Sequence, residues 1–265
     1  MENNIRPKKN LGQNFLREIS TLQKITDAAE LKNSDRVLEI GTGTGTLTKL
    51  LADNCGTVIT VEKDTEILRL AQQALKDKSN ITFLNQDVLK LNVNRLQLNS
   101  YKVVGNIPYY LTGKLLQLIL EEWPKPELAV LLVQAEVATK LLEQRKRSIL
   151  SVITQLLANI EKIGLVSRKL FWPMPRVNSA IIKITPWKTN VFQANPNLKQ
   201  LIKTGFSSPR KLLISNLKNS LPAQAQFQFD PAKLSKAFQK LNLAPSSRAE
   251  NLSPETWVKL SQSLF

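Results

Sequence analysis

Glu39-Ile-Gly-Thr-Gly-Thr-Gly-Thr-Leu-Thr48 is the strongest indication in this chain of an α/β domain. Its three glycines follow the predicted strand Arg36–Ile40 and precede a predicted helix, where glycine lets the backbone turn tightly and approach a ligand closely. A dinucleotide fingerprint would require glycine in place of Thr46, and no Walker lysine follows, so neither of those nucleotide sites is favoured. Taken alone, the stretch fits a structural turn as well as a binding turn of an α/β domain.

Short β-branched runs alternate with stretches of helical period from Arg36 to about Ile184. This alternation is typical of a sheet flanked by helices. The predicted strands are Arg36–Ile40, Thr57–Val61, Ile81–Leu84, Lys102–Val104, Leu128–Val133, Ile160–Val166 and Ser179–Ile184. We therefore expect an α/β fold built on a doubly wound sheet.

The segment from Pro186 to Pro196 combines two prolines with polar residues and ends the last strand-like run, so we place a linker there. Beyond it the pattern is helical only, as in Leu234, Ala237, Phe238 and Leu241. From position 190 onward, ten Lys or Arg residues stand against three Asp or Glu residues. We predict one domain over residues 1–188 and a small all-α domain over residues 189–265.

The charge balance points to a polyanionic partner. The chain has 37 Lys and Arg against 21 Asp and Glu, a net charge of +16. Nucleic acid is the first candidate for a protein this basic. The N-terminus lacks the apolar core of a signal peptide, and no apolar run approaches the roughly 20 residues that span a bilayer, so we expect a soluble, cytoplasmic protein without a membrane partner.

Histidine is absent, and Cys55 is the single cysteine. These two facts exclude imidazole bases, internal disulfides and cysteine-based zinc clusters, and we expect no metal. The chemistry must therefore use carboxylates, amides, hydroxyls and backbone groups.

Two acids strengthen the interpretation of the glycine turn as a binding site. Glu62 ends the next strand about 20 residues after Gly41, where a carboxylate can accept hydrogen bonds from both ribose hydroxyls of an adenosine-containing cofactor. Asp87 follows the third strand, where a carboxylate can accept a hydrogen bond from the adenine amine. Ligands of α/β sheets bind at that edge, so the joint placement favours an adenosine pocket over two solvated loop residues.

Asn106-Ile-Pro-Tyr109 follows the fourth predicted strand and resembles the N-P-P-Y motif of amino-methyltransferases. An exocyclic adenine amine is a poor nucleophile because its lone pair is delocalised into the ring. The Asn106 side-chain oxygen and the Pro108 carbonyl can accept its two hydrogens and favour a pyramidal nitrogen. Tyr109 can stack on the extruded base, a contact worth about 1–3 kcal/mol. Methyl transfer to such an amine depends mostly on positioning and requires no metal.

At these residues the chain resembles the ribosomal RNA adenine N6,N6-dimethyltransferase family, in its small-subunit (KsgA) type. The resemblance extends over nearly the whole chain. Its further segments are Pro7-Lys-Lys-Asn-Leu-Gly-Gln-Asn-Phe-Leu16, Gln134-Ala-Glu-Val-Ala138, Phe171-Trp-Pro-Met-Pro-Arg-Val-Asn-Ser-Ala180, 206–216 and 245–253.

The resemblance implies S-adenosylmethionine as cofactor within a Rossmann-like class I methyltransferase fold. The opening segment folds over the cofactor in the family, so the implied contacts are Asn14, Leu16, Gly41, Gly43, Glu62, Asp87 and Asn106. Phe171 is implied to lie on the opposite face of the target base. The implied substrate is a pair of adjacent adenines in a hairpin loop near the 3′ end of small-subunit ribosomal RNA, each methylated twice, in an assembling small subunit. Unpaired loop bases cost little to extrude.

Two positions depart from the family pattern. Asn178 stands where aspartate is usual, a form shared with the antibiotic-resistance branch that modifies large-subunit RNA. Pro209 replaces the first residue of a basic run and leaves only Arg210 and Lys211. The alternatives are therefore a large-subunit enzyme of that branch and a non-catalytic ribosome-assembly factor. A DNA adenine methyltransferase and a nicotinamide dehydrogenase fit less well.

RNA docking by a basic monomer should be mostly electrostatic. The candidate contacts are Arg6, Lys8, Lys9, Arg145, Lys146, Arg147, Arg210 and Lys211. Each phosphate contact removed should lower the slope of log affinity against log salt by about 0.7–0.9.

Overall fold

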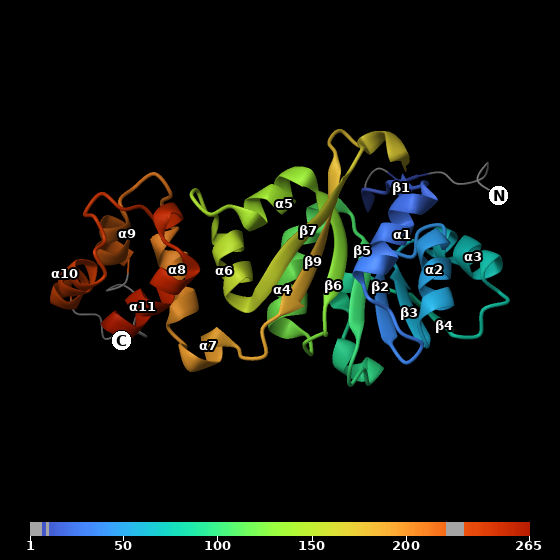
Figure 1. Cartoon of the computed structure of the whole chain (residues 1–265), viewed down its shortest axis with the longest axis horizontal. Coiled ribbons are helices and arrows are strands. Elements are labelled where there is room, and N and C mark those ends of the chain that lie inside the picture. Colours follow the sequence, from blue (N-terminus) through green and yellow to red (C-terminus); the bar gives the residue numbers. More distant parts are fainter. Residues whose placement is uncertain (1–6, 9–10, 221–230) are drawn as a thin grey trace. The chain divides into compact units, whose positions relative to one another are not determined.

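The structure, a computed structural model, describes residues 7–8, 11–220 and 231–265 (Figure 1). The chain divides into two compact units. The first comprises residues 1–138 and 159–186, and the second comprises residues 139–158 and 187–265. The second unit thus takes in a segment that precedes the last two long strands, and the domain boundary at residue 188 stays a prediction.

Seven strands of the described chain form one mixed sheet in the order β4-β3-β2-β5-β6-β9-β7. The strands are β2 (Arg36–Ile40), β3 (Thr57–Glu62), β4 (Ile81–Asn85), β5 (Lys102–Asn106), β6 (Ala129–Gln134), β7 (Ala158–Val166) and β9 (Ser179–Pro186). The first five strands of that order are parallel, and β9 runs antiparallel to β6. Each predicted strand is confirmed within two residues at either end, as is the α/β fold class.

The register brings the ends of neighbouring strands together. Ile40 at the end of β2 lies opposite Val61 in β3 and opposite Gly105 in β5. Parallel strands place their carboxyl ends at one edge, so the loops that follow β2, β3, β4 and β5 share that edge.

Helices complete the first unit. They are α1 (Ile19–Ala28), α2 (Thr46–Asn54), α3 (Thr65–Ala74), α4 (Thr112–Gln117) and the beginning of α5 (Ala135–Leu142). Leu22 and Ile25 of α1 and Leu51 of α2 are buried in one apolar cluster with Val37 and Val104 of the sheet. Burial of each such side chain contributes about 1.5–3 kcal/mol, which fixes the helices that flank the glycine turn.

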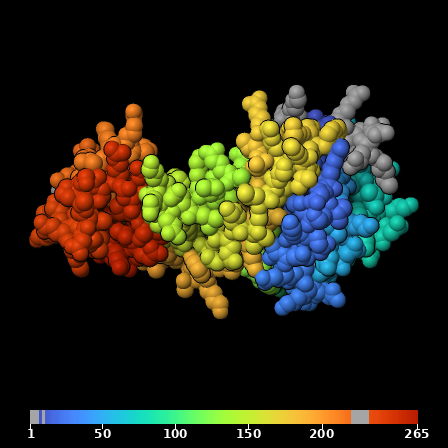
Figure 2. Space-filling view, turned by 45° about the horizontal axis from the view of Figure 1, so that its top comes forward, coloured from blue at the N-terminus to red at the C-terminus, as the bar shows by residue number. Residues whose placement is uncertain are grey.

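A second, two-stranded sheet joins distant parts of the first unit. In it β1 (Phe15–Leu16) pairs antiparallel with β8 (Phe171–Trp172). The ring centroids of Phe15 and Trp172 lie 6.4 Å apart, and Arg17 lies over the Trp172 ring. The blue N-terminal part of the chain and the yellow part that contains β8 accordingly lie side by side on the surface (Figure 2). Strands of two residues carry no periodicity, which is why the sequence did not predict them.

The second unit is helical, as predicted for the C-terminal region. Its helices are α6 (Ile149–Leu157), α7 (Val191–Ala194), α8 (Leu198–Gly205), α9 (Leu213–Ser220), α10 (Pro231–Lys240) and α11 (Pro254–Leu264), with the end of α5. Trp257 is fully buried at the centre of its apolar cluster, where it stacks on Phe206. The predicted linker contains the four-residue helix α7.

Candidate active site

A cavity opens at the carboxyl edge of the sheet. Its walls come from the segments that follow β2, β3, β4 and β5 and from residues 11–16, which we call the N-terminal strap. Predicted site residues on these walls are Asn14, Leu16, Gly41, Gly43, Glu62, Asp87, Asn106, Pro108 and Tyr109. The structure therefore brings together all the predicted cofactor contacts and three of the four predicted catalytic residues.

Gly41 makes the first turn after β2 possible. Its φ is +85°, and a Cβ at this position would lie 3.2 Å from the backbone oxygen of Asn106. The Gly41 N–H donates to the Val61 carbonyl at 2.9 Å. Because any side chain would push β2 and β5 apart here, glycine lets the two loops approach each other around the cavity.

The Glu62 carboxylate is held at the cavity wall by backbone donors. Its Oε2 accepts from the Gly43 N–H at 3.2 Å, and its Oε1 accepts from the Asp64 N–H at 2.9 Å. Burial raises the pKa of Glu62 above its ordinary value. Each oxygen keeps a lone pair for a further donor, such as a ribose hydroxyl.

Asp87 is fixed by a lysine that the sequence did not single out. Its Oδ1 accepts from the Leu89 N–H at 3.0 Å, and its Oδ2 lies 2.9 Å from the Lys63 Nζ. The hydrogen bond from Lys63 holds the pKa of Asp87 below its ordinary value. Lys63 also lines the cavity, so this acid is ionised and oriented beside the pocket.

Asn106 is oriented by the strap. Its Nδ2 donates to the Asn14 carbonyl at 3.2 Å. No donor within the described residues reaches its Oδ1, so that oxygen is available to a ligand amine. Pro108, two residues on, already accepts at its carbonyl from the Leu111 N–H at 3.0 Å and keeps one lone pair.

Tyr109 is held by a residue for which the sequence indicated no role. Its hydroxyl lies 2.7 Å from the Oγ of Ser179, which is fully buried at the start of β9. Burial raises the pKa of Tyr109 above its ordinary value. This hydrogen bond fixes the position of the hydroxyl end of the ring at the cavity wall.

Phe171 does not lie on the cavity wall. It is 4% exposed and belongs to the apolar cluster that also contains Leu16 and Leu22. It pairs with Leu16 in the two-stranded sheet. Its role against the target base stays a prediction.

A cluster of buried polar side chains lies next to the glycine turn. Glu39 in β2 is fully buried, and its Oε2 accepts from the Thr48 hydroxyl at 2.6 Å, whereas no group among the described residues hydrogen-bonds its Oε1. Burial raises the pKa of Glu39 to about 8. Nearby, the hydroxyls of Thr42 and Thr60 lie 2.6 Å apart. Glu39 is therefore mostly protonated at neutral pH, which removes the cost of a buried charge.

The predicted RNA contacts fall into three groups. Arg145, Lys146, Arg210 and Lys211 are exposed, and Arg147 is half-buried. Lys8 is instead engaged by Asp64 and Glu66. Arg6 and Lys9 lie outside the described residues.

Two solved structures of transferases have a similar fold. A 23S rRNA methyltransferase, ErmE, is 27% identical with a TM-score of 0.77 over 94% of this chain and 99% of that chain. A dimethyladenosine transferase from Plasmodium falciparum is also 27% identical, with a TM-score of 0.78 over 93% of this chain and 95% of that chain. Fold and cavity together define a Rossmann-like methyltransferase, as predicted.

Within this class, the chain belongs to the ribosomal RNA adenine dimethylase family, whose pattern it matches over residues 4–264. Ribosomal RNA small subunit methyltransferase A of Acaryochloris marina is 37% identical over 98% of this chain and 97% of the relative. The protein of the same name from Synechococcus elongatus is 38% identical over 97% and 95%. No helix in the described part of the chain is long and apolar enough to cross a membrane.

Proposed function

We propose that this protein transfers methyl groups from S-adenosylmethionine to the N6 amines of two adjacent adenines in a hairpin loop near the 3′ end of small-subunit ribosomal RNA. Each adenine receives two methyl groups, and the reaction belongs to small-subunit assembly. The observation that carries the proposal is the open Oδ1 of Asn106, held beside Pro108 and Tyr109 on the wall of the cavity. The names of the small-subunit relatives support the choice of RNA.

The cavity wall offers the hydrogen-bond acceptors and the apolar surface that an adenosyl group needs. Carboxylates of Glu62 and Asp87 lie on its wall to accept hydrogen bonds from the ribose hydroxyls and from the adenine amine. Val88 and Leu16 offer apolar surface beside them, and Gly41 leaves room where a side chain would reach Asn106. S-adenosylmethionine supplies a methyl group on a positively charged sulfonium.

Asn106 and Tyr109 prepare the accepting amine. The Asn106 Oδ1 accepts one N6 hydrogen, and the free lone pair of the Pro108 carbonyl accepts the other, which favours a pyramidal nitrogen with an exposed lone pair. Tyr109, braced by Ser179, stacks on the base. The proton of the product ammonium passes to water, because an N-methylated adenine cation is acidic.

The exposed basic residues of the second unit suit RNA docking. Arg145, Lys146, Arg210 and Lys211 are all exposed, so they can reach phosphates. We assign RNA binding to them and to the helical region 189–265. The proposal includes a monomer acting in the cytoplasm, where it meets the assembling subunit.

The test is methylation of purified subunits with labelled S-adenosylmethionine. Undermethylated small subunits should accept about four methyl groups per particle, two on each of two adjacent adenines located by mapping, and large subunits should accept none. Asn106→Ala serves as the inactive control on the same particles. Label on large-subunit RNA would favour the resistance-type reaction, and label on neither would overturn the proposal.

A further inference from the structure

The N-terminal strap forms part of the cavity wall without belonging to the main sheet. All six of its residues, 11–16, line the cavity. Gly12 packs so closely under Tyr110 that a Cβ there would lie 3.2 Å from the tyrosine ring. The strap therefore needs anchors of its own, and it has one at each end.

The anchor at the C-terminal end of the strap is the two-stranded sheet. Phe15 and Leu16 pair with Trp172 and Phe171, and most of this contact is apolar or backbone hydrogen bonding. This strand pairing does not depend on polar side chains, so replacing a single polar side chain elsewhere in the strap should leave it intact.

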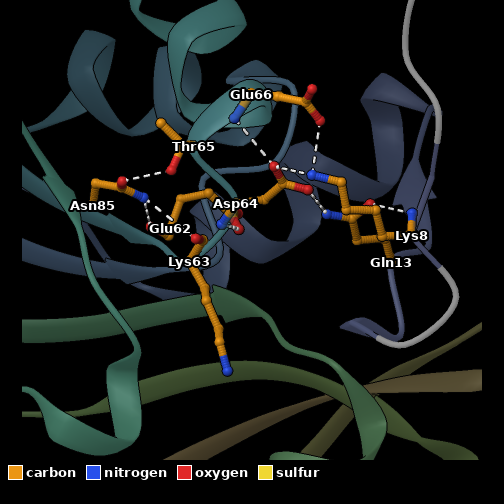
Figure 3. A network of polar contacts seen from close by, with 8 residues as sticks. All are labelled: Lys8, Gln13, Glu62, Lys63, Asp64, Thr65, Glu66 and Asn85. Carbon is orange, nitrogen blue, oxygen red and sulfur yellow. Dashed lines mark hydrogen bonds and ion pairs between the residues drawn. The ribbon is translucent and has the colours of Figure 1, made fainter.

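The other anchor is a cluster of polar side chains that we call the latch: Lys8, Gln13, Asp64 and Glu66 (Figure 3). Asp64 lies at its centre, with a side chain only 1% exposed. Its Oδ2 accepts from the Gln13 Nε2 at 2.9 Å, and its Oδ1 accepts from the Lys8 Nζ at 3.0 Å and from the Glu66 N–H at 3.1 Å. A buried carboxylate with these donors is fully satisfied.

Further contacts close the latch into a ring. The Lys8 Nζ lies 2.7 Å from the Glu66 Oε2, and the Lys8 N–H donates to the Gln13 Oε1 at 2.7 Å. Hydrogen bonds to Glu66 and Asp64 raise the pKa of Lys8. Burial opposes ionisation of Asp64, but donors from Lys8 and Gln13 still hold its pKa below the ordinary value. The ring therefore stays charged and closed around neutral pH.

The latch is hydrogen-bonded to the Glu62 carboxylate and lies next to the residue that contacts Asn106. The Asp64 N–H donates to the Glu62 Oε1 at 2.9 Å, so the same residue holds the carboxylate assigned to the ribose (Figure 3). Gln13 precedes Asn14, whose carbonyl accepts from the Asn106 amide. Displacement of Gln13 would therefore move the group that orients the catalytic amide.

We propose that Asp64 is a positioning residue that, through Gln13 and Lys8, latches the strap over the cavity and so aligns Asn106 and Glu62. Lys8 acts in this latch and not as an RNA contact. The proposal rests on the proposed function for its kinetic consequences, whereas the latch itself can be measured without RNA.

The first experiment compares Gln13→Leu and Lys8→Met with wild type in the full chain. Without RNA, we expect amide hydrogen exchange over residues 11–16 to speed up about tenfold and the Kd for S-adenosylmethionine to rise about tenfold, the scale of a lost charge-assisted hydrogen bond. Lys8→Arg should restore most of both values, and Lys78→Met, which removes the surface ion pair with Asp53, should change neither.

The second experiment reverses the hydrogen bond at the centre of the latch. Asp64→Asn alone should weaken cofactor binding, and Asp64→Asn combined with Gln13→Glu should recover part of the loss because donor and acceptor exchange places. Because Asp64 also caps α3, a melting curve for each variant accompanies the measurement, and Gln13→Leu carries the test if Asp64→Asn fails to fold.

Kinetics on small subunits separate the latch from RNA docking. For Lys8→Met we expect a lower kcat and a higher KM for the cofactor with an unchanged KM for RNA. A change confined to RNA affinity, with a salt slope lowered by about 0.7–0.9, would overturn the proposal in favour of a phosphate contact. Unchanged exchange and cofactor affinity in Gln13→Leu would also overturn it. Failure of wild type to methylate either subunit would overturn the proposed function and leave the exchange result standing.

Discussion

The two walls of the cavity are built in different ways. One wall consists of the glycine turn and the Asn106–Tyr109 loop, which continue directly from β2 and β5 and are held by strand register and a buried core. The other is the N-terminal strap, which is held by the side chain of Asp64 at the N-terminus of α3 and by a two-residue strand. A wall made by backbone pairing can shift only if the sheet shifts, whereas a wall held by a few side chains can move in a folded protein. The chemistry should therefore reside on the first wall and the adjustment of the pocket on the second.

Asn106→Ala should give the largest effect, because it removes the amide oxygen that the first wall offers to the target amine. Methyl transfer should fall about 10²–10³-fold, the scale of one preorganised polar contact, while cofactor affinity is largely kept. Single-turnover rates and a binding titration measure the two quantities. Near-normal turnover would assign the chemistry to some other group.

Glu39→Gln should remove a pH dependence of the free energy of unfolding, because Glu39 is buried under the first wall. Between pH 4.5 and about 8 the folded protein binds more protons at Glu39 than the unfolded chain does, so the free energy of unfolding of wild type falls as pH rises in this window. Glutamine imitates the protonated form and does not titrate. The free energy of unfolding of the variant should therefore rise relative to that of wild type by a few kcal/mol between pH 5 and pH 8. Denaturant titrations at both pH values measure the difference. Parallel pH curves for the two proteins would mean that Glu39 is not protonated in the fold.

Alanine at Gly41 and at Gly12 compares the walls directly. Both glycines have positive φ, which costs another residue about 1–2 kcal/mol. At Gly41 the obstacle is the Asn106 backbone, so the melting temperature should drop by several degrees. At Gly12 the obstacle is the exposed Tyr110 ring, so the strap should shift, with cofactor affinity about five- to tenfold lower and little change in melting temperature. An equal drop in melting temperature in both variants would show that the two walls are held equally rigidly.

Tyr109→Phe should have the smallest effect. It keeps the ring but loses the hydrogen bond to Ser179, and we expect kcat to fall about fivefold, equivalent to about 1 kcal/mol. Adding Ser179→Ala should restore part of the rate, since no buried hydroxyl is then left without a partner. A double variant that is slower than Tyr109→Phe would show that Ser179 has a separate role.

Much of the first wall could be predicted because its signals are local. The β-branched run Arg36–Ile40 ends at the glycine turn, and the structure has that strand with the same bounds. Glu62, Asp87 and Asn106 each end or follow a parallel strand, and parallel strands deliver their ends to one edge. Strand ends and turn residues are properties of a few consecutive positions, so pattern alone sufficed.

The second wall could not be predicted in the same way. Lys8 contacts Asp64, which lies 56 positions further along the chain. Nothing in the sequence around Lys8 distinguishes it from a surface lysine, so we predicted an RNA contact there. Phe171 sits in a motif yet is buried in the apolar cluster with Leu16 and Leu22, a packing that its own stretch of sequence does not reveal.

Periodicity and turn chemistry were enough to predict the α/β fold, the helical C-terminal region and the edge of the sheet where the cavity lies. The three-dimensional structure was needed to show which side chains hold the strap, which residue bonds the Tyr109 hydroxyl and that Glu39 is buried with a raised pKa. Those properties depend on contacts between distant residues and on the loss of water around them, and neither is a property of any single stretch of chain.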